Sequence, residues 1–115
     1  MTQALLTEKR RSHRVRVNIR VAYRSASVTL YGQVADLSRN GVFLRSDYLD
    51  GKGSAVELEI LLPGRDKALI LRGEVVWVDL RPSCSGMGIQ FRNVQGMARR
   101  ALANFMIEQA YPVLG

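Results

Sequence analysis

Residues 33–45, QVADLSRNGVFLR, place a run of turn-forming residues between two apolar segments. Asp36 to Gly41 are typical of a tight turn, because Asp, Ser and Asn side chains bond nearby backbone groups and Gly adopts conformations closed to other residues. The apolar pattern ends at Ala35 and resumes at Val42. This stretch therefore predicts a strand, a turn and a second strand.

Strand-like alternation extends on both sides of this stretch. Val17, Ile19, Val21 and Tyr23 alternate with a second set that includes Asn18, Arg20 and Arg24, which is the pattern of a half-buried strand. The other predicted strands cover residues 28–35, 42–44, 56–60, 68–80 and 87–91. Gly73 lies inside the fifth of the six, where a glycine indicates a bulge or bend.

The last segment has the spacing of a helix. Its apolar positions are Met97, Ala98, Ala101, Leu102, Phe105 and Met106. Six short strands followed by one helix predict a mostly β protein, a small six-stranded antiparallel barrel with a C-terminal α-helix. A β-sandwich is the competing architecture.

Length and composition limit the range of functions. With 115 residues and 12.9 kDa, the chain has room for one domain. One cysteine, Cys84, and one histidine, His13, leave no set of ligands for a structural zinc, so no metal is expected. No apolar run approaches the roughly 20 residues of a membrane span. Residues 1–8 lack a signal-peptide pattern, so we expect a cytoplasmic protein without membrane insertion.

The positive charge is localised near the N-terminus. The net charge is +7, and no acid occurs between Glu8 and Asp36. Seven of the 17 cations fall in a short segment: Lys9, Arg10, Arg11, Arg14, Arg16, Arg20 and Arg24. We expect residues 1–15 to form a flexible basic arm and residues 16–115 to form the folded domain, with an anionic partner.

Two motifs occur in order along the chain. Arg10-x-x-x-Arg14 precedes the first strand, and D-x-S-x-x-G follows at residues 36–41. A Gly-Val-Phe-Leu strand start and a late Gly-Met-Gly-Ile-Gln-Phe strand complete the pattern, which resembles the PilZ domain family over residues 8–106. The resemblance implies a six-stranded Greek-key barrel that binds the bacterial second messenger cyclic di-GMP, without catalysis and without a cofactor.

The resemblance also implies a binding site. Arg10 and Arg14 would grip phosphate oxygens or the O6 and N7 acceptors of guanine, with Arg11 and Lys9 at the edge. Ionised Asp36 would accept hydrogen bonds from a guanine edge. The remaining predicted contacts are Ser38, which would exchange a hydrogen bond with the ligand, Gly41, which would allow close approach of the backbone, and additionally Arg39, Asn40 and Gly88. The number of bound ligands stays open, although Lys9 favours a pair.

Ligand binding would pull the arm onto the barrel and change the surface offered to a downstream protein. Two other functions stay open: a PilZ adaptor that binds protein and no nucleotide, and a nucleic-acid-binding barrel of the OB or cold-shock type. The second is disfavoured, because such barrels interleave aromatic and basic residues, whereas these cations concentrate in one arm and only 7% of residues are aromatic.

The turn also has simpler interpretations. Asp36-x-Ser38-x-Asn40-Gly41 copies the start of an EF-hand loop, but Asp47 replaces the usual bidentate Glu and two arginines lie inside the loop, which disfavours calcium. A purely structural turn is the stronger alternative. Trp77, Tyr23, Tyr31 and Tyr48 are expected at the core or its rim, where one of them could flank a guanine.

Overall fold

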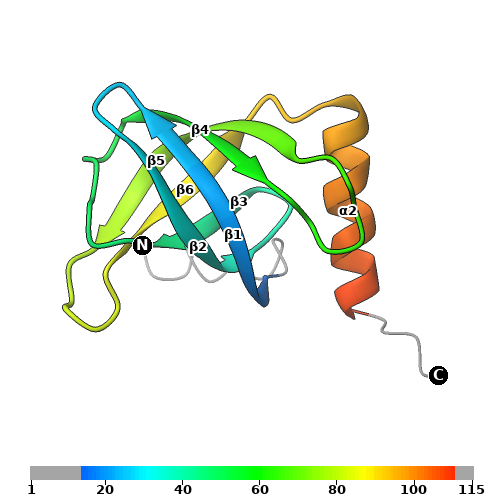
Figure 1. The fold of residues 1–115 in the computed structure, drawn as a ribbon, viewed down its shortest axis with the longest axis horizontal. Helices are drawn as coiled ribbons and strands as arrows, with labels where there is room; N and C mark the ends of the chain where they lie inside the picture. Colours follow the sequence, from blue (N-terminus) through cyan, green and yellow to red (C-terminus); the bar gives the residue numbers. More distant parts are fainter. Residues whose placement is uncertain (1–13, 111–115) are drawn as a thin grey trace, which may run out of the picture.

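Within residues 14–110, the part of the chain that the computed structural model describes, there are six strands and one helix (Figure 1). They are β1 (Val15–Ser25), β2 (Thr29–Leu37), β3 (Gly41–Arg45), β4 (Ala55–Ile60), β5 (Leu69–Asp79), β6 (Gly86–Arg92) and α2 (Gly96–Ala110). The predicted mostly β fold with a C-terminal helix is confirmed. β1 begins one residue before the predicted start of the folded domain.

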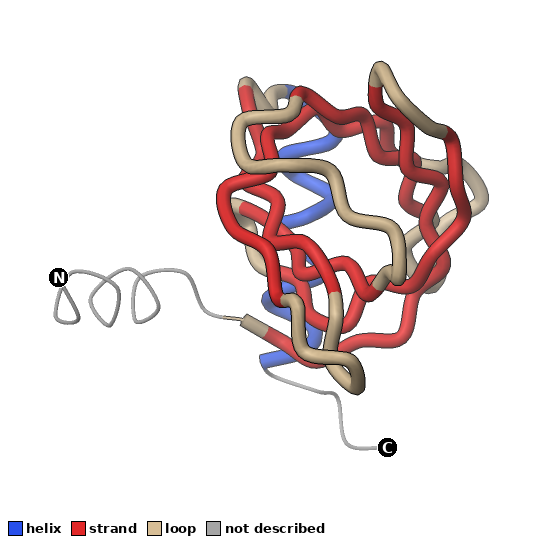
Figure 2. The backbone as a smooth tube through the Cα atoms, turned by 90° about the vertical axis from the view of Figure 1, so that its left-hand side faces the viewer, coloured by secondary structure: helices blue, strands red, loops and turns tan. Residues whose placement is uncertain are grey.

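The six strands close into an antiparallel barrel. Their order around it is β1-β2-β3-β6-β5-β4, and β1 pairs with β4 to complete the ring. β3 lies between β2 and β6 in the barrel, but the chain continues from β3 to β4, which lies on the other side of β1. This crossover is the Greek-key connection. Figure 2 shows the strands around the interior and α2 beside them. The barrel is confirmed and the alternative sandwich is not observed.

Alternating residues of the strands fill the barrel. On β1, Ile19, Val21 and Tyr23 are buried while Arg20 between them is exposed, as the alternation predicts. The side of α2 facing the barrel carries Ala101, Leu102, Phe105 and Met106, all buried. Met97 was predicted to belong to this stripe, but it is 72% exposed. Ala98 is partly buried against the core, so the packed side of the helix begins at Ala98 and excludes Met97 alone.

The register is irregular in three strand pairs, β1 with β2, β2 with β3 and β5 with β6, and the last two irregularities reverse the alternation on one side of the barrel. Between β2 and β3 the register places Val34 opposite Leu44 and Asp36 opposite Phe43, so that Ala35 is an extra residue. Val34 and Leu37 are both buried as a result, and Asp36 turns outward. A bulge commonly redirects a side chain in this way.

The second bulge lies at Val76 in β5. Val75 pairs with Ile89 and Trp77 pairs with Gly88, so one residue of β5 is unmatched. Val75 is fully buried, whereas Trp77 is 41% exposed. Without the bulge both residues would lie on the same face of the strand.

Gly73 is not the bulge that its position suggested. Its pairing with Val56 and with Phe91 is regular on both sides. A Cβ atom at this position would lie 2.6 Å from the carbonyl oxygen of Gln90. The glycine therefore permits close approach of β6, which is the other common reason for a glycine inside a strand.

The connection between β3 and β4 is anchored to the barrel by one carboxylate. Asp50 is 8% exposed and accepts hydrogen bonds from the hydroxyls of Tyr23 and Tyr48. Its backbone N–H also contacts the sulfur of Met87 at 3.4 Å. These contacts satisfy both carboxylate oxygens, which makes the burial of the charge tolerable.

Candidate ligand-binding face

The register brings five residues from five strands into one row. Arg16 on β1 lies opposite Asp36 on β2, Asp36 opposite Phe43 on β3, Phe43 opposite Gly88 on β6, and Gly88 opposite Trp77 on β5. Apart from the bulged Ala35, the neighbours of these residues along β2, β3 and β6 are buried in the core: Leu37, Val42, Leu44, Met87 and Ile89. The row therefore runs along the outside of the barrel. We call it the outer row.

Asp36 is paired with the first residue that the structure describes. Arg14 Nη1 donates to Asp36 Oδ1 at 2.6 Å, and the two side chains are 37% and 29% exposed. This contact joins the second arginine of the R-x-x-x-R motif to the aspartate of the D-x-S-x-x-G motif. The sequence separation of the pair is 22 residues, and only the pairing of β1 with β2 brings them together.

Ser38 holds the turn from inside. Its side chain is 1% exposed, and Ser38 Oγ accepts hydrogen bonds from the N–H groups of Asn40 and Gly41 at 3.2 and 3.1 Å. The backbone N–H of Ser38 donates to the carbonyl of Gly41 at 2.9 Å. The hydroxyl, which was expected to contact the ligand directly, is thus used within the turn itself.

Gly41 was expected to let the backbone approach a ligand, but the observed close approach is to β6. A Cβ atom on Gly41 would lie 2.3 Å from the carbonyl oxygen of Ile89. Such a contact is far shorter than van der Waals separation, so a side chain here would push β3 away from β6. The last residue of the motif is therefore required by the packing of the barrel.

Gly88 lies beneath an aromatic pair on the outer row. The rings of Phe43 and Trp77 are stacked, with centroids 5.1 Å apart and planes 8° from parallel. A Cβ atom on Gly88 would lie 2.1 Å from Trp77 Nε1, and one on Gly86 would lie 2.5 Å from the ring of Phe43. The two glycines of β6 thus make room for rings from the strands on either side, an arrangement known to stabilise glycines in sheets.

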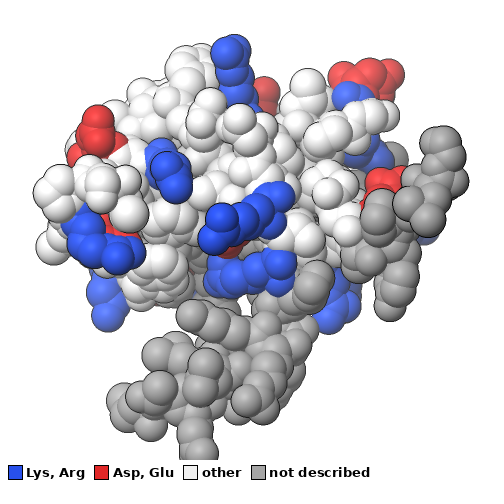
Figure 3. Space-filling view, turned by 90° about the horizontal axis from the view of Figure 1, so that it is seen from below, with Lys and Arg blue, Asp and Glu red and all other residues white. Residues whose placement is uncertain are grey.

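The remaining predicted site residues divide into two groups. Arg39 and Asn40 occupy the exposed tip of the turn. Lys9, Arg10 and Arg11 lie outside the described residues. Figure 3 shows Lys and Arg side chains spread over the face seen from below, two of them side by side near its centre, with fewer Asp and Glu side chains among them. This face suits an anionic ligand.

Sequence reasoning missed the role of Phe43 and did not place Trp77 on this face. The available signal was the pair of glycines in Gly86-Met87-Gly88, since small residues in the middle of a sheet leave room for large neighbours. The partners of those glycines could not be identified without the register.

Within residues 14–110, no three side chains of His, Cys, Asp or Glu are grouped so that they could ligate a metal. In the same range, α2 is too short and too polar to cross a membrane.

The family of the chain follows from comparison with known proteins. The model of the PilZ domain matches residues 8–108. The chain therefore belongs to the PilZ domain family, as the two motifs suggested. No curated protein matches the chain in sequence.

Solved structures with the same fold include one of MotI/DgrA and two of YcgR. The Bacillus subtilis inhibitor of motility MotI/DgrA is 15% identical, with a TM-score of 0.71 over 90% of this chain and 52% of its own. Escherichia coli YcgR in complex with c-di-GMP is 18% identical, with a TM-score of 0.68 over 89% of this chain and 46% of its own. The isolated PilZ domain of YcgR with c-di-GMP is 17% identical, with a TM-score of 0.63 over 91% and 99%. The chain thus spans about half the length of MotI/DgrA and of the longer YcgR chain.

Proposed function

We propose that this chain is a receptor for cyclic di-GMP that binds the ligand on the outer row and has no catalytic step. The observation that carries the proposal is the contact between Arg14 and Asp36, because it joins the two motifs at one place on the barrel surface. Membership of the PilZ family and the c-di-GMP complexes of YcgR support the choice of ligand.

The chemistry of the two side chains suits this ligand. The guanidinium of Arg14 has five N–H donors, of which the contact with Asp36 Oδ1 uses one. The other N–H groups of Arg14 can donate to phosphate oxygens or to the acceptor edge of guanine. Asp36 carries a second oxygen that can accept from the N1 and N2 donors of guanine. A carboxylate favours a base edge beside it, since it would repel a phosphate.

The aromatic pair extends the same surface. Phe43 is the immediate cross-strand neighbour of Asp36, and Trp77 lies two further strands away, roughly 14 Å from Asp36 at ordinary strand spacing. A guanine held by Asp36 therefore lies beside aromatic rings on which flat bases stack. The bulges at Ala35 and Val76 orient the carboxylate and the indole outward.

The arm completes the site in this proposal. Arg10 and Arg11, with Lys9 at the edge, close over a ligand that is seated on the outer row. This closing changes the charge and shape of the surface next to β1. A downstream protein then recognises the liganded form, so that the ligand acts through the difference between two states.

Isothermal titration calorimetry with cyclic di-GMP tests the proposal. The wild type is compared with Arg10→Ala and Arg14→Ala, and Arg65→Ala, in the exposed loop before β5, is the control for loss of one charge. GTP and a short single-stranded oligonucleotide are titrated in parallel.

Submicromolar to low-micromolar binding by the wild type and Arg65→Ala, with loss in both arm variants, would support the receptor. Absence of binding to cyclic di-GMP by the wild type would overturn it in favour of a protein-binding adaptor. Binding of the oligonucleotide instead would indicate a nucleic-acid-binding barrel.

A further inference from the structure

A hollow of about 300 Å³ lies where the turn between β2 and β3, the end of β6 and the start of α2 meet. Phe91 is 8% exposed and Leu102 is 1% exposed, so they form an apolar floor. The full set of lining residues is Arg39, Asn40, Phe91, Val94, Arg99, Leu102 and Ala103. The volume is at the low end of small-molecule sites, which are about 300–1,000 Å³.

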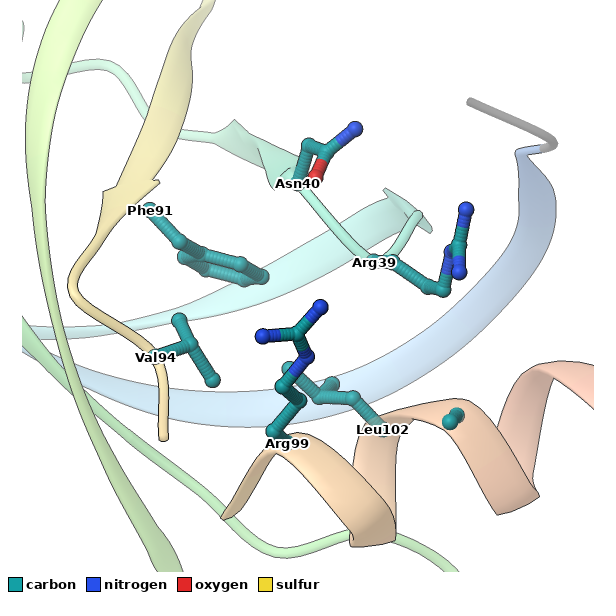
Figure 4. A pocket seen from close by; sticks show the side chains of 7 residues that line it. Arg39, Asn40, Phe91, Val94, Arg99 and Leu102 are labelled. Atoms are coloured by element: carbon teal, nitrogen blue, oxygen red, sulfur yellow. The ribbon is translucent and has the colours of Figure 1, made fainter. Parts of the chain in front are cut away.

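Two arginines from different elements border the hollow. Arg39 comes from the turn and Arg99 from the start of α2, and both are exposed. Figure 4 shows Arg99 reaching from α2 toward the turn that carries Arg39 and Asn40. Among residues 14–110, neither arginine forms an ion pair with an acidic side chain. Two guanidinium groups above an apolar floor suit a flat group that carries negative charge.

The hollow is joined to the outer row by the turn. The carbonyl of Asn40 accepts from the N–H of Phe91 at 2.7 Å, and the N–H of Asn40 donates to Ser38 Oγ at 3.2 Å. These bonds fix Arg39 relative to the floor of the hollow. The turn follows directly on the end of β2, which carries Asp36 on the outer row. The segment from Asp36 to Asn40 therefore has the carboxylate at its start and Arg39, which lines the hollow, near its end.

We infer that this hollow is a subsite for part of the ligand, in which Arg99 of α2 and Arg39 bind one nucleotide half of a cyclic dinucleotide. The inference rests on the proposed function, and adds α2 to the elements that contact the ligand. The hollow is small for an entire dinucleotide, so it receives one half, or one half of a second copy, while the outer row holds the other. The apolar floor lies against the base or ribose, and the guanidinium groups donate to phosphate oxygens.

The test compares two adjacent arginines of α2. Arg99→Ala removes a lining residue, whereas Arg100→Ala removes the same charge from the next position, which is exposed and does not line the hollow. Calorimetric titration with cyclic di-GMP is expected to show affinity reduced about tenfold or more in Arg99→Ala, and within about twofold of wild type in Arg100→Ala. Circular dichroism spectra establish that both variants are folded.

A second variant separates shape from charge. Ala103→Phe fills the hollow without changing the net charge, and it is expected to lower the affinity or the number of ligands bound. Equal affinity and stoichiometry in Arg99→Ala, Ala103→Phe and Arg100→Ala would overturn the subsite and leave the receptor proposal intact. Failure of the wild type to bind cyclic di-GMP would overturn the receptor proposal, and the subsite with it.

Discussion

Arg14 and Asp36 form an ion pair across 2.6 Å on the outside of the barrel, between the residue preceding β1 and the bulged end of β2. Both side chains are partly exposed, so the pair contributes at most about 1 kcal/mol to folding. The main effect of the ion pair is to hold the two side chains next to each other. Each keeps groups that can still form hydrogen bonds with a ligand.

Asp36→Ala separates binding from stability. We expect the affinity for cyclic di-GMP to fall about tenfold or more, because the acceptor for a guanine edge is lost and Arg14 is no longer positioned. The thermal midpoint should change little, because the ion pair is partly exposed. Calorimetric titration and thermal unfolding give the two quantities. Asp66→Ala, in the exposed loop before β5, is the control, and equal affinities in both variants would contradict the prediction.

Gly41→Ala is expected to destabilise the fold. The added Cβ would lie 2.3 Å from the carbonyl oxygen of Ile89, so β3 or β6 must shift. Overpacking of this kind costs about 1–3 kcal/mol, which lowers the melting temperature on the order of 10 °C in a domain of this size. Gly51→Ala is the matched control, because a Cβ there meets nothing within 4 Å. The melting temperatures of the two variants should differ clearly. Equal melting temperatures would show that the strands accommodate the added Cβ without loss of stability.

Ligand binding should alter the fluorescence of Trp77. It is the only tryptophan of the chain and lies 41% exposed on the outer row, so its emission reports on this face alone. A titration with cyclic di-GMP should give a fluorescence change with the midpoint found by calorimetry. Gly88→Ala should shift the emission without ligand, because the new Cβ would lie 2.1 Å from Trp77 Nε1. If calorimetry detects binding but the emission of Trp77 stays constant, the ligand binds away from the aromatic pair.

Tyr23→Phe should destabilise the fold through Asp50. The substitution keeps the ring in the core but leaves Asp50 Oδ2 without the hydrogen bond from the Tyr23 hydroxyl. An unsatisfied buried acceptor costs about 1–3 kcal/mol. Urea denaturation measures the difference in free energy of unfolding. The control is Tyr31→Phe, which removes a hydroxyl from a residue that is 83% exposed. A loss of unfolding free energy as large as that in Tyr23→Phe would refute the explanation.

The stability should also depend on the protonation of Asp50. Burial alone would raise the pKa of this carboxyl, but its hydrogen bonds, that from Tyr23 foremost, outweigh burial and hold the pKa below its ordinary value. The resulting stabilisation is complete above the unfolded pKa, about 3.9, and is lost as the pH falls through the lower pKa of the folded state. The free energy of unfolding of Asp50→Asn should therefore decline less steeply than that of the wild type below about pH 4. Denaturation at several pH values measures the free energy of unfolding of both proteins. If the two free energies fall in parallel with pH, Asp50 is not the group responsible.

Much of the architecture could be predicted from local pattern. The alternation of Val17 to Tyr23 sets the buried face of β1, and the turn residues between Ala35 and Val42 mark the break between β2 and β3. These features depend on backbone preference and on hydrophobic period, which neighbouring residues determine. The helical spacing near the C-terminus likewise identified α2, although not the exposure of Met97.

The composition of the candidate site was only partly accessible to such reasoning. Arg14 and Asp36 were selected from motifs and do meet, but the hydroxyl of Ser38 bonds within its own turn, and Gly41 faces Ile89. Motif spacing does not distinguish a residue that contacts a ligand from one that shapes the turn. That distinction depends on which strand packs against which.

The sequence by itself determined the number, order and kind of elements and the localised positive charge, because these depend on residues close together in the chain. Only the tertiary structure decided that Asp36 and Trp77 face outward. By simple alternation each would share a face with a buried valine, Val34 or Val75. The bulges opposite β3 and β6 reverse that parity, and a bulge exists only in the register between two strands.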